Sequence, residues 1–234
     1  MPKIPRVVIP GCPHHVVQRG NRRLRVFFSD DDKGVYLELI RRHALKCGLS
    51  IWAYCLMDNH VHLVIIPKEK DSLARGLGEA HRKYTSLINI RENWRGYLWQ
   101  GRFLSYPMDG GHLFAAIRYI ERNPVRARLV ARAEQYKWSS APAHVLKSQD
   151  KLLSPCPLMR EITDWAAYLG QTDEDAEVRK LVAHERTGRP LGDKAFVRKL
   201  EALTGRTLAP KKRGRPGNTI SVSEFPKTIK TPEE

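Results

Sequence analysis

Two histidines separated by a single residue are the first candidates for chemistry. His60 and His62 flank Val61 in a segment rich in Val, Leu and Ile. Side chains at positions i and i+2 of a β-strand point to the same face, so we expect the two imidazoles to lie side by side. Neutral imidazoles are common ligands of divalent metals. The pair therefore predicts a metal site, although two hydrogen-bonded histidines on a solvated strand would have the same spacing.

A tyrosine and an asparagine four residues apart form the second candidate pair. Tyr119 and Asn123 lie at the end of a segment with helical spacing, which places them on one helix face. A phenol becomes a useful nucleophile toward phosphorus when its proton is removed or its charge is neutralised. The Asn123 amide oxygen suits a hard metal ion, which would polarise a phosphate. Taken alone, Tyr119 is explained better as a core aromatic residue.

The charge balance indicates the kind of partner. Lys and Arg number 41 against 25 acidic residues, a formal net charge of +16. Such an excess favours a polyanion, because each neutralised phosphate releases counterions. An acidic membrane surface is the competing partner. We favour nucleic acid, because the chain shows no basic amphipathic helix with an aromatic apolar face.

Three further features predict a cytoplasmic, nucleoid-associated protein. No apolar run approaches the roughly 20 residues of a membrane span. The N-terminal residues lack the apolar core of a signal peptide. The four cysteines include no CxxC pair and are typical of a reducing compartment.

Several segments combine cations with rings or with a flexible glycine, as binding to unpaired DNA requires. They are residues 18–22 (Gln-Arg-Gly-Asn-Arg), 81–84 (His-Arg-Lys-Tyr) and 99–102 (Trp-Gln-Gly-Arg). Arginines also surround Tyr119. The candidate DNA contacts are Gln18, Arg19, Asn21, Arg22, Arg82, Lys83, Gln100, Arg102, Arg118, Arg122 and Arg126. A solvated basic surface is the alternative for each segment.

The C-terminal tail supplies a further basic cluster. Its candidate DNA contacts are Lys211, Lys212, Arg213 and Arg215. The Arg-Gly-Arg-Pro core is narrow and extended, which suits an A·T-rich minor groove. Nonspecific binding is the commoner role of a short basic tail.

Periodicity and turn signals predict an α+β protein. Strands are expected at 14–20, 49–57, 60–66 and 99–106, and helices at 31–47, 72–91, 111–122 and 125–133. Asp58-Asn59 is the turn of a hairpin. Asn123-Pro124 ends a helix, because the residue before proline disfavours the α region. The order of strand, helix, two strands, helix and strand favours mainly antiparallel pairing.

The chain divides into four predicted parts. A catalytic domain is expected at 1–145, followed by a linker at 146–157. Residues 158–205 show three short helical patterns, at 158–169, 173–186 and 192–203, and form a small helical region that could bind DNA. Residues 206–234 form the basic tail, which composition predicts to be disordered without a partner.

These motifs resemble a known family. Residues 55–64, which contain His-Val-His, are similar to the His-hydrophobe-His motif of single-tyrosine HUH transposases. Residues 118–127 (Arg-Tyr-Ile-Glu-Arg-Asn-Pro-Val-Arg-Ala) resemble the tyrosine helix of their REP-associated branch. Residues 15–22 and 99–103 match as well, so the resemblance covers about residues 5–140.

The resemblance implies a ferredoxin-like core with the histidine pair on a central strand. It implies a single-stranded DNA substrate recognised next to a hairpin, cleaved by Tyr119 to leave a 5′-phosphotyrosine and a free 3′-hydroxyl. It also implies Mg²⁺ or Mn²⁺, held by His60, His62 and Asn123. Mobile-element relatives have glutamine at the position of Asn123. The asparagine side chain is shorter than glutamine and reaches less far toward a metal. A homodimer is left open.

Two alternatives remain at this stage. A rolling-circle replication initiator or relaxase would share the histidines and the tyrosine, but the Trp-Gln-Gly-Arg segment at 99–102 argues against it. A DNA-binding regulator without catalysis is disfavoured by the presence of His60, His62 and Tyr119 together.

Overall fold

A four-stranded antiparallel sheet with the order β2-β3-β1-β4 forms the centre of the protein. The computed structural model describes residues 5–157, 161–171 and 175–209. The strands are β1 (His14–Arg19), β2 (Leu49–Met57), β3 (His60–Pro67) and β4 (Leu104–Pro107). The β2–β3 hairpin closes through Asp58 and Asn59, as expected.

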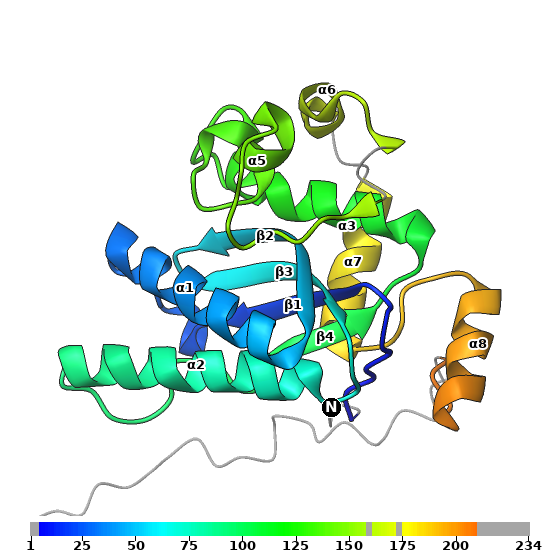
Figure 1. The fold of residues 1–234 in the computed structure, drawn as a ribbon, viewed down its shortest axis with the longest axis horizontal. Coiled ribbons are helices and arrows are strands. Elements are labelled where there is room, and N and C mark those ends of the chain that lie inside the picture. Colours follow the sequence, from blue (N-terminus) through cyan, green and yellow to red (C-terminus); the bar gives the residue numbers. More distant parts are fainter. Residues whose placement is uncertain (1–4, 158–160, 172–174, 210–234) are drawn as a thin grey trace, which may run out of the picture.

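Two long helices cover one face of the sheet (Figure 1). They are α1 (Asp30–Cys47) and α2 (Ser72–Arg91). Ser29 caps α1 with Asp32 in a capping box. Val61, Leu63 and Ile65 of β3 are fully buried against this helical layer. The order β1-α1-β2-β3-α2-β4 with this sheet topology confirms the expected α+β, ferredoxin-like fold.

Later segments of the chain cover the opposite face (Figure 1). They begin with α3 (Gly110–Glu121) and α4 (Asn123–Arg126), and continue with α5 (Ala141–Leu146), α6 (Trp165–Gly170) and α7 (Asp175–Thr187). Leu181 of α7 and Trp165 of α6 are buried in one apolar cluster with the sheet residues Val64 and Tyr106. The helices beyond residue 157 thus help to enclose this face.

A third, smaller cluster joins the two ends of the described chain. Leu200 of α8 (Lys194–Thr204) and Leu208 pack against Val7 and Ile9. Arg206 donates hydrogen bonds to the backbone oxygens of Pro5 and Arg6, and so fixes the N-terminal segment beside α8. Two short 3-10 turns, η1 (Asn21–Arg23) and η2 (Ala133–Gln135), complete the described elements.

Two predicted elements are wrong in extent. The strand expected at 99–106 begins only at Leu104, because Leu98, Trp99 and Phe103 bury their side chains in the α1–α2 core and the backbone there makes irregular bonds. The helix expected at 125–133 is α4 alone, since Arg128 adopts a left-handed φ of 57°. The helices predicted at 158–169, 173–186 and 192–203 correspond to the shorter or shifted α6, α7 and α8.

Some predictions are not tested by the fold. The domain boundaries at 145, 157 and 205 stay predictions. Lys211, Lys212, Arg213 and Arg215 lie outside the described residues. None of the four cysteines forms a disulfide. Within the described ranges, no helix has the length and apolar character needed to cross a bilayer.

Candidate functional site

Strand β3 places the two candidate histidines on the face that α3 covers. Because Val61 points into the α1–α2 core, its neighbours His60 and His62 point the other way. Their ring centroids lie 5.1 Å apart. His62 is almost fully buried at 1% exposure, whereas His60 is partly exposed. The expected juxtaposition of the two imidazoles is present.

Helix α3 brings Tyr119 to the same place. The Asp109 side chain accepts a hydrogen bond from the His112 N–H and caps the start of α3. From this helix the Tyr119 ring lies edge-on to His62, with 5.8 Å between the ring centroids. Tyr119 is buried at 8% exposure, and its remaining surface lines a cavity.

Burial keeps both histidines in the form that binds metals. Desolvation, followed by the charges of Arg19 and Arg126, lowers the pKa of His60 to about 4. Desolvation lowers the pKa of His62 further, with contributions from His15 and His60. Both imidazoles are therefore neutral at pH 7, and each has a nitrogen lone pair to offer a cation.

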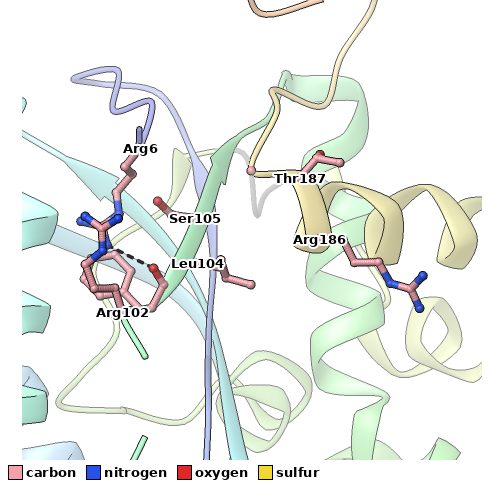
Figure 2. A pocket seen from close by; sticks show the side chains of 8 residues that line it. Arg6, Arg102, Leu104, Ser105, Arg186 and Thr187 are labelled. Atoms are coloured by element: carbon pink, nitrogen blue, oxygen red, sulfur yellow. Dashed lines mark hydrogen bonds between the residues drawn. The ribbon is translucent and has the colours of Figure 1, made fainter. Parts of the chain in front are cut away.

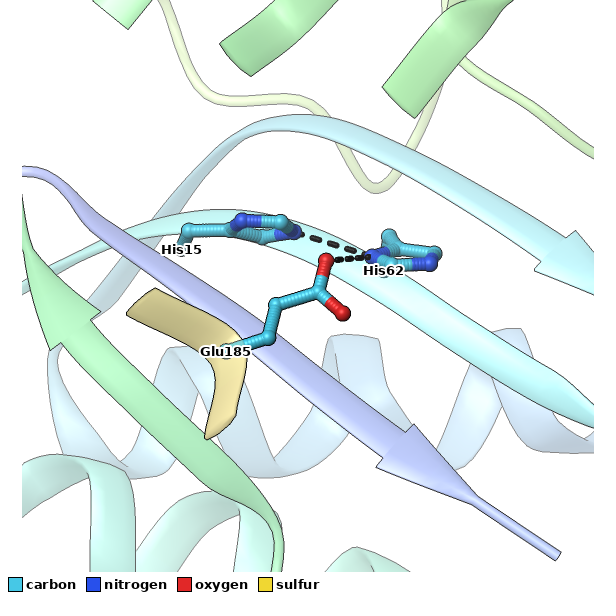
Figure 3. Close-up of side chains that lie close together, drawn as sticks. All are labelled: His15, His62 and Glu185. Carbon is cyan, nitrogen blue, oxygen red and sulfur yellow. Dashed lines mark hydrogen bonds and ion pairs between the residues drawn. The ribbon is translucent and has the colours of Figure 1, made fainter. Parts of the chain in front are cut away.

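A carboxylate that sequence reasoning missed completes the cluster. Glu185 of α7 lines the same cavity as Tyr119, and its Oε1 lies 3.9 Å from Nδ1 of His62 (Figure 3). Burial raises the pKa of Glu185 to about 7, while Arg19 and Arg126 oppose this shift. Burial, together with the charge of Glu185, raises the pKa of Tyr119 to about 12. No local pattern marks Glu185, because it comes 66 residues after Tyr119 in the sequence.

The donor set fits a divalent cation on two observations. Oε1 of Glu185 and Nδ2 of Asn123 are buried without a hydrogen-bond partner among the described residues. The oxygen and nitrogen of an amide can exchange places by a flip, so Asn123 can present its oxygen instead. Two imidazole nitrogens with an amide or carboxylate oxygen are donors that Mn²⁺ and Mg²⁺ accept.

A second grouping of possible ligands exists beside the first. His15, His62 and Glu185 offer ligand atoms that lie within 4.8 Å of one another. In this grouping, however, Nε2 of His15 and Nδ1 of His62 already share a hydrogen bond of 2.9 Å (Figure 3). A cation bound between them would have to replace that bond. We therefore favour the side of His62 that faces His60 as the place for a cation.

Positive charge surrounds the Tyr119 hydroxyl. The guanidinium of Arg126 lies over the Tyr119 ring, 3.9 Å from its centroid. A cavity of about 400 Å³ opens beside them, lined by Tyr119 and Glu185 together with Arg19, Arg23, Gln100, Arg102 and Arg186. A phosphate in this cavity would meet cations on several sides.

Two further hollows continue from this cavity along the loop at 100–102. One, of about 680 Å³, lies between α2 and this loop and is lined by Arg6, Arg82 and Arg102 with the exposed Tyr97. The other is small, and Arg6 and Arg102 line it on one side with Arg186 and Thr187 of α7 on the other (Figure 2). Together they form a basic path on either side of the loop.

The other predicted DNA contacts divide into exposed and engaged groups. Asn21 is partly exposed, and Arg22, Arg82, Lys83, Gln100 and Arg102 are exposed. Gln18 is buried and donates to the Gly101 oxygen. Arg118 forms an ion pair with Glu177, and Arg122 donates to the Leu169 oxygen, so both hold α6 and α7 in place.

The rings expected to stack on unpaired bases are mostly inaccessible. His81, Tyr84 and Trp99 are between 1% and 6% exposed and belong to the α1–α2 side of the protein. Their packing follows from the apolar stripe of α2 and from burial of the loop before β4. Tyr97, at 87% exposure, is the accessible ring of this region.

Comparisons with known proteins find one family and two solved structures that are similar to this chain. Residues 9–123 match the family described as IS200-like transposase. A solved structure of a REP-associated tyrosine transposase bound to a REP hairpin is similar, with a TM-score of 0.54 and 18% identity over 67% of this chain and 93% of that one. A crystal structure of a candidate transposase from Deinococcus radiodurans has 22% identity over 52% of this chain and 97% of that one, with a TM-score of 0.36. No curated protein matches.

Proposed function

We propose that the protein is a metal-dependent endonuclease and strand transferase, because residues 9–123 match the family described as IS200-like transposase. Its proposed substrate is single-stranded DNA next to a hairpin, on the nucleoid in the cytoplasm. The observation that supports this proposal most is the cluster of Tyr119, His60, His62 and Glu185. Two of its members, Tyr119 and Glu185, line one basic cavity.

The metal would be Mg²⁺ or Mn²⁺, held by His60, His62 and an oxygen of Asn123. When bound, it would polarise the scissile phosphate and stabilise the additional negative charge of the transition state. We assign Glu185 a different role from the metal ligands, because it lines the same cavity as Tyr119 and its charge acts on the Tyr119 hydroxyl. A carboxylate with a pKa near 7 is well matched to accept the phenolic proton at neutral pH.

The proposed cleavage step involves one bond made and one broken. The Tyr119 oxygen attacks phosphorus, its proton passes to Glu185, and the bond from phosphorus to the 3′-oxygen breaks. The 3′-oxygen takes a proton from solvent, which leaves a free 3′-hydroxyl and a 5′-phosphotyrosine. Arg126, stacked on the Tyr119 ring, favours the phenolate that develops on the way. Rejoining is the reverse of this step and needs no external energy.

The basic path beside Tyr119 supports a single strand as substrate. The hollows on either side of the loop at 100–102 place Arg6, Arg102 and Arg186 along one course. The solved structure of the similar REP-associated transposase contains a REP hairpin. We propose that this chain likewise binds a hairpin, with the unpaired flank lying along the basic path.

Cleavage mapping tests this proposal. End-labelled oligonucleotides that carry palindromes from the DNA flanking the gene would be incubated with the protein and Mn²⁺, with EDTA as the metal-free control. We expect cutting at one site beside the hairpin, and none when the same sequence is fully paired. Equal cutting of the blunt duplex would contradict the substrate assignment. Tight binding without any cutting would instead indicate a regulator.

A further inference from the structure

Hydrogen bonds inside the protein occupy Nδ1 of both candidate metal-binding histidines. Nδ1 of His62 lies 2.9 Å from Nε2 of His15. Nδ1 of His60 lies 2.6 Å from Oδ1 of Asn59. The Nε2 atom of each ring is the one left for a metal. Whether Nε2 carries a lone pair or a proton depends on the tautomer, and the tautomer depends on what the Nδ1 partners can donate or accept.

The direction of the bonds around His62 follows from one backbone carbonyl. The Tyr106 hydroxyl lies 3.2 Å from the oxygen of Leu181 and 2.7 Å from Nδ1 of His15. A carbonyl can only accept, so Tyr106 donates its single proton to Leu181. The Tyr106 oxygen must then accept a hydrogen bond from Nδ1–H of His15. His15 consequently has a bare Nε2, which accepts from Nδ1–H of His62.

Burial prevents the series of hydrogen bonds from Leu181 to His62 from forming in any other way. His15 and Tyr106 have no solvent-exposed surface, and His62 is 1% exposed. Water therefore cannot replace any of the three partners. A charged imidazole is costly to bury, so the fully buried His15 is neutral and cannot donate from both ring nitrogens. If the hydrogen bonds ran in the opposite direction, Tyr106 would donate to His15 and could no longer donate to the Leu181 oxygen.

A second, shorter series of hydrogen bonds fixes the tautomer of His60 in the same way. Nδ2 of Asn59 donates to the backbone oxygen of Arg23 at 3.0 Å, which fixes the orientation of the amide. Oδ1 of Asn59 then faces His60 and can only accept. His60 must donate from Nδ1–H. Its Nε2, like that of His62, keeps its lone pair.

We propose that Tyr106 and His15 are positioning residues that fix His62 as the Nδ1–H tautomer, and that Asn59 does the same for His60. Both imidazoles are thereby prepared, before any metal arrives, to offer Nε2 as a ligand. The inference rests on the proposed function for the role of the metal. The tautomers themselves are set by hydrogen bonds within the metal-free protein.

These hydrogen bonds also connect the metal site to helix α7. Leu181 and Glu185 are one turn apart on α7, so one helix supplies the carbonyl that orients His62 and the carboxylate that contacts Tyr119. Partners of this kind typically change metal affinity by about 10- to 100-fold when they are removed. We expect a loss in that range when the chain to His62 is interrupted.

The tautomers can be read directly in the full chain without metal. Nitrogen NMR of protein labelled with ¹⁵N-histidine distinguishes a protonated from a bare ring nitrogen. We expect bare Nε2 atoms on His60 and His62 in the wild type. A protonated Nε2 on His62 in the metal-free wild type would overturn the inference, and this measurement requires no variant.

Two substitutions at one position separate positioning from packing. His15→Gln places an amide oxygen near the former Nε2 and keeps an acceptor for His62, whereas His15→Leu fills similar space without one. Isothermal titration with Mn²⁺ should show nearly wild-type affinity for His15→Gln and a loss of about 10- to 100-fold for His15→Leu. Tyr106→Phe should give mixed His62 tautomers. Tyr84→Phe, which removes a buried hydroxyl on the other side of the sheet, should change neither readout.

The outcomes distinguish this inference from the proposed function. If the wild type binds Mn²⁺ and His15→Leu binds it equally well with an unchanged His62 tautomer, the positioning role is refuted. If the wild type binds no Mn²⁺, the metal part of the proposed function fails, while the NMR result still decides the tautomer. Should His15→Leu not fold, the comparison of His15→Gln, Tyr106→Phe and Tyr84→Phe carries the same test.

Discussion

Replacing Glu185 by Gln should stabilise the metal-free protein, and the gain should grow with pH. Burial raises the pKa of this carboxyl from 4.5 to about 7. Below pH 4.5 the carboxyl is protonated in both the folded and the unfolded state and affects stability little. Above pH 7 it is ionised in both states, and the folded state bears the cost of a buried charge. Glutamine has no such charge at any pH.

The size of the gain follows from the shift. Each pKa unit corresponds to about 1.4 kcal/mol, so the ionised carboxylate lowers the free energy of unfolding by about 3 kcal/mol at pH 8. At pH 5 the same linkage leaves about 1 kcal/mol, because the unfolded chain ionises there and the folded protein does not. Glu185 is only 8% exposed, so little screening by solvent is expected. Glu185→Gln should therefore gain about 2 kcal/mol more at pH 8 than at pH 5.

Urea denaturation in EDTA at the two pH values measures this difference. Glu177→Gln is a matched control on the same helix, since the Glu177 side chain is 41% exposed and forms an ion pair with Arg118. The change in stability between pH 5 and pH 8 should be clearly larger for Glu185→Gln than for this control. Equal stability changes for Glu185→Gln at the two pH values would show that the carboxyl is not held in a desolvating environment and would refute the reasoning.

Three further changes follow from the site. His60→Ala should abolish cleavage in Mn²⁺ yet retain most DNA binding, because phosphate contacts come mainly from Arg and Lys; unchanged cleavage would remove His60 from the metal site. Arg126→Met should slow cleavage at least about tenfold through loss of the cation over Tyr119, while the Mn²⁺ affinity in titration stays unaltered. A wild-type cleavage rate would exclude Arg126 from stabilising the Tyr119 phenolate. Truncation after Ala209 removes four clustered cations of the tail and should reduce the log–log salt slope of single-strand binding by up to about 3, without moving the cut position; an unchanged slope would exclude the tail from the interface.

The fold could be predicted from local patterns because its strands and helices have clear apolar periodicity and turn residues at their ends. The alternation around Val61 fixed the face of His60 and His62, and helical spacing with Pro124 placed Tyr119 near a helix end. The loop before β4 was harder, since Trp99 has the composition of a strand but packs as a core residue. Tertiary packing overrides β propensity there.

The rest of the site depends on contacts between distant segments. His15 reaches His62 only because β1 pairs with β3. The register of this pairing cannot be deduced from the sequence of either strand alone. Glu185 reaches Tyr119 because α7 packs across β4 and α3. A charged residue on a helix is usually solvated, so nothing in the sequence near position 185 separates it from the other acids of that helix.

The covalent link between Tyr119 and DNA is the measurement that tests the central claim most directly. Labelled single-stranded hairpin DNA would be incubated with the protein and Mn²⁺, denatured, and the protein–DNA adduct mapped by mass spectrometry. We expect the adduct on Tyr119, its loss in Tyr119→Phe with DNA affinity retained, and its persistence in Tyr97→Phe, which alters an exposed ring of the basic path. An adduct on another residue, or full cleavage by Tyr119→Phe, would contradict the account.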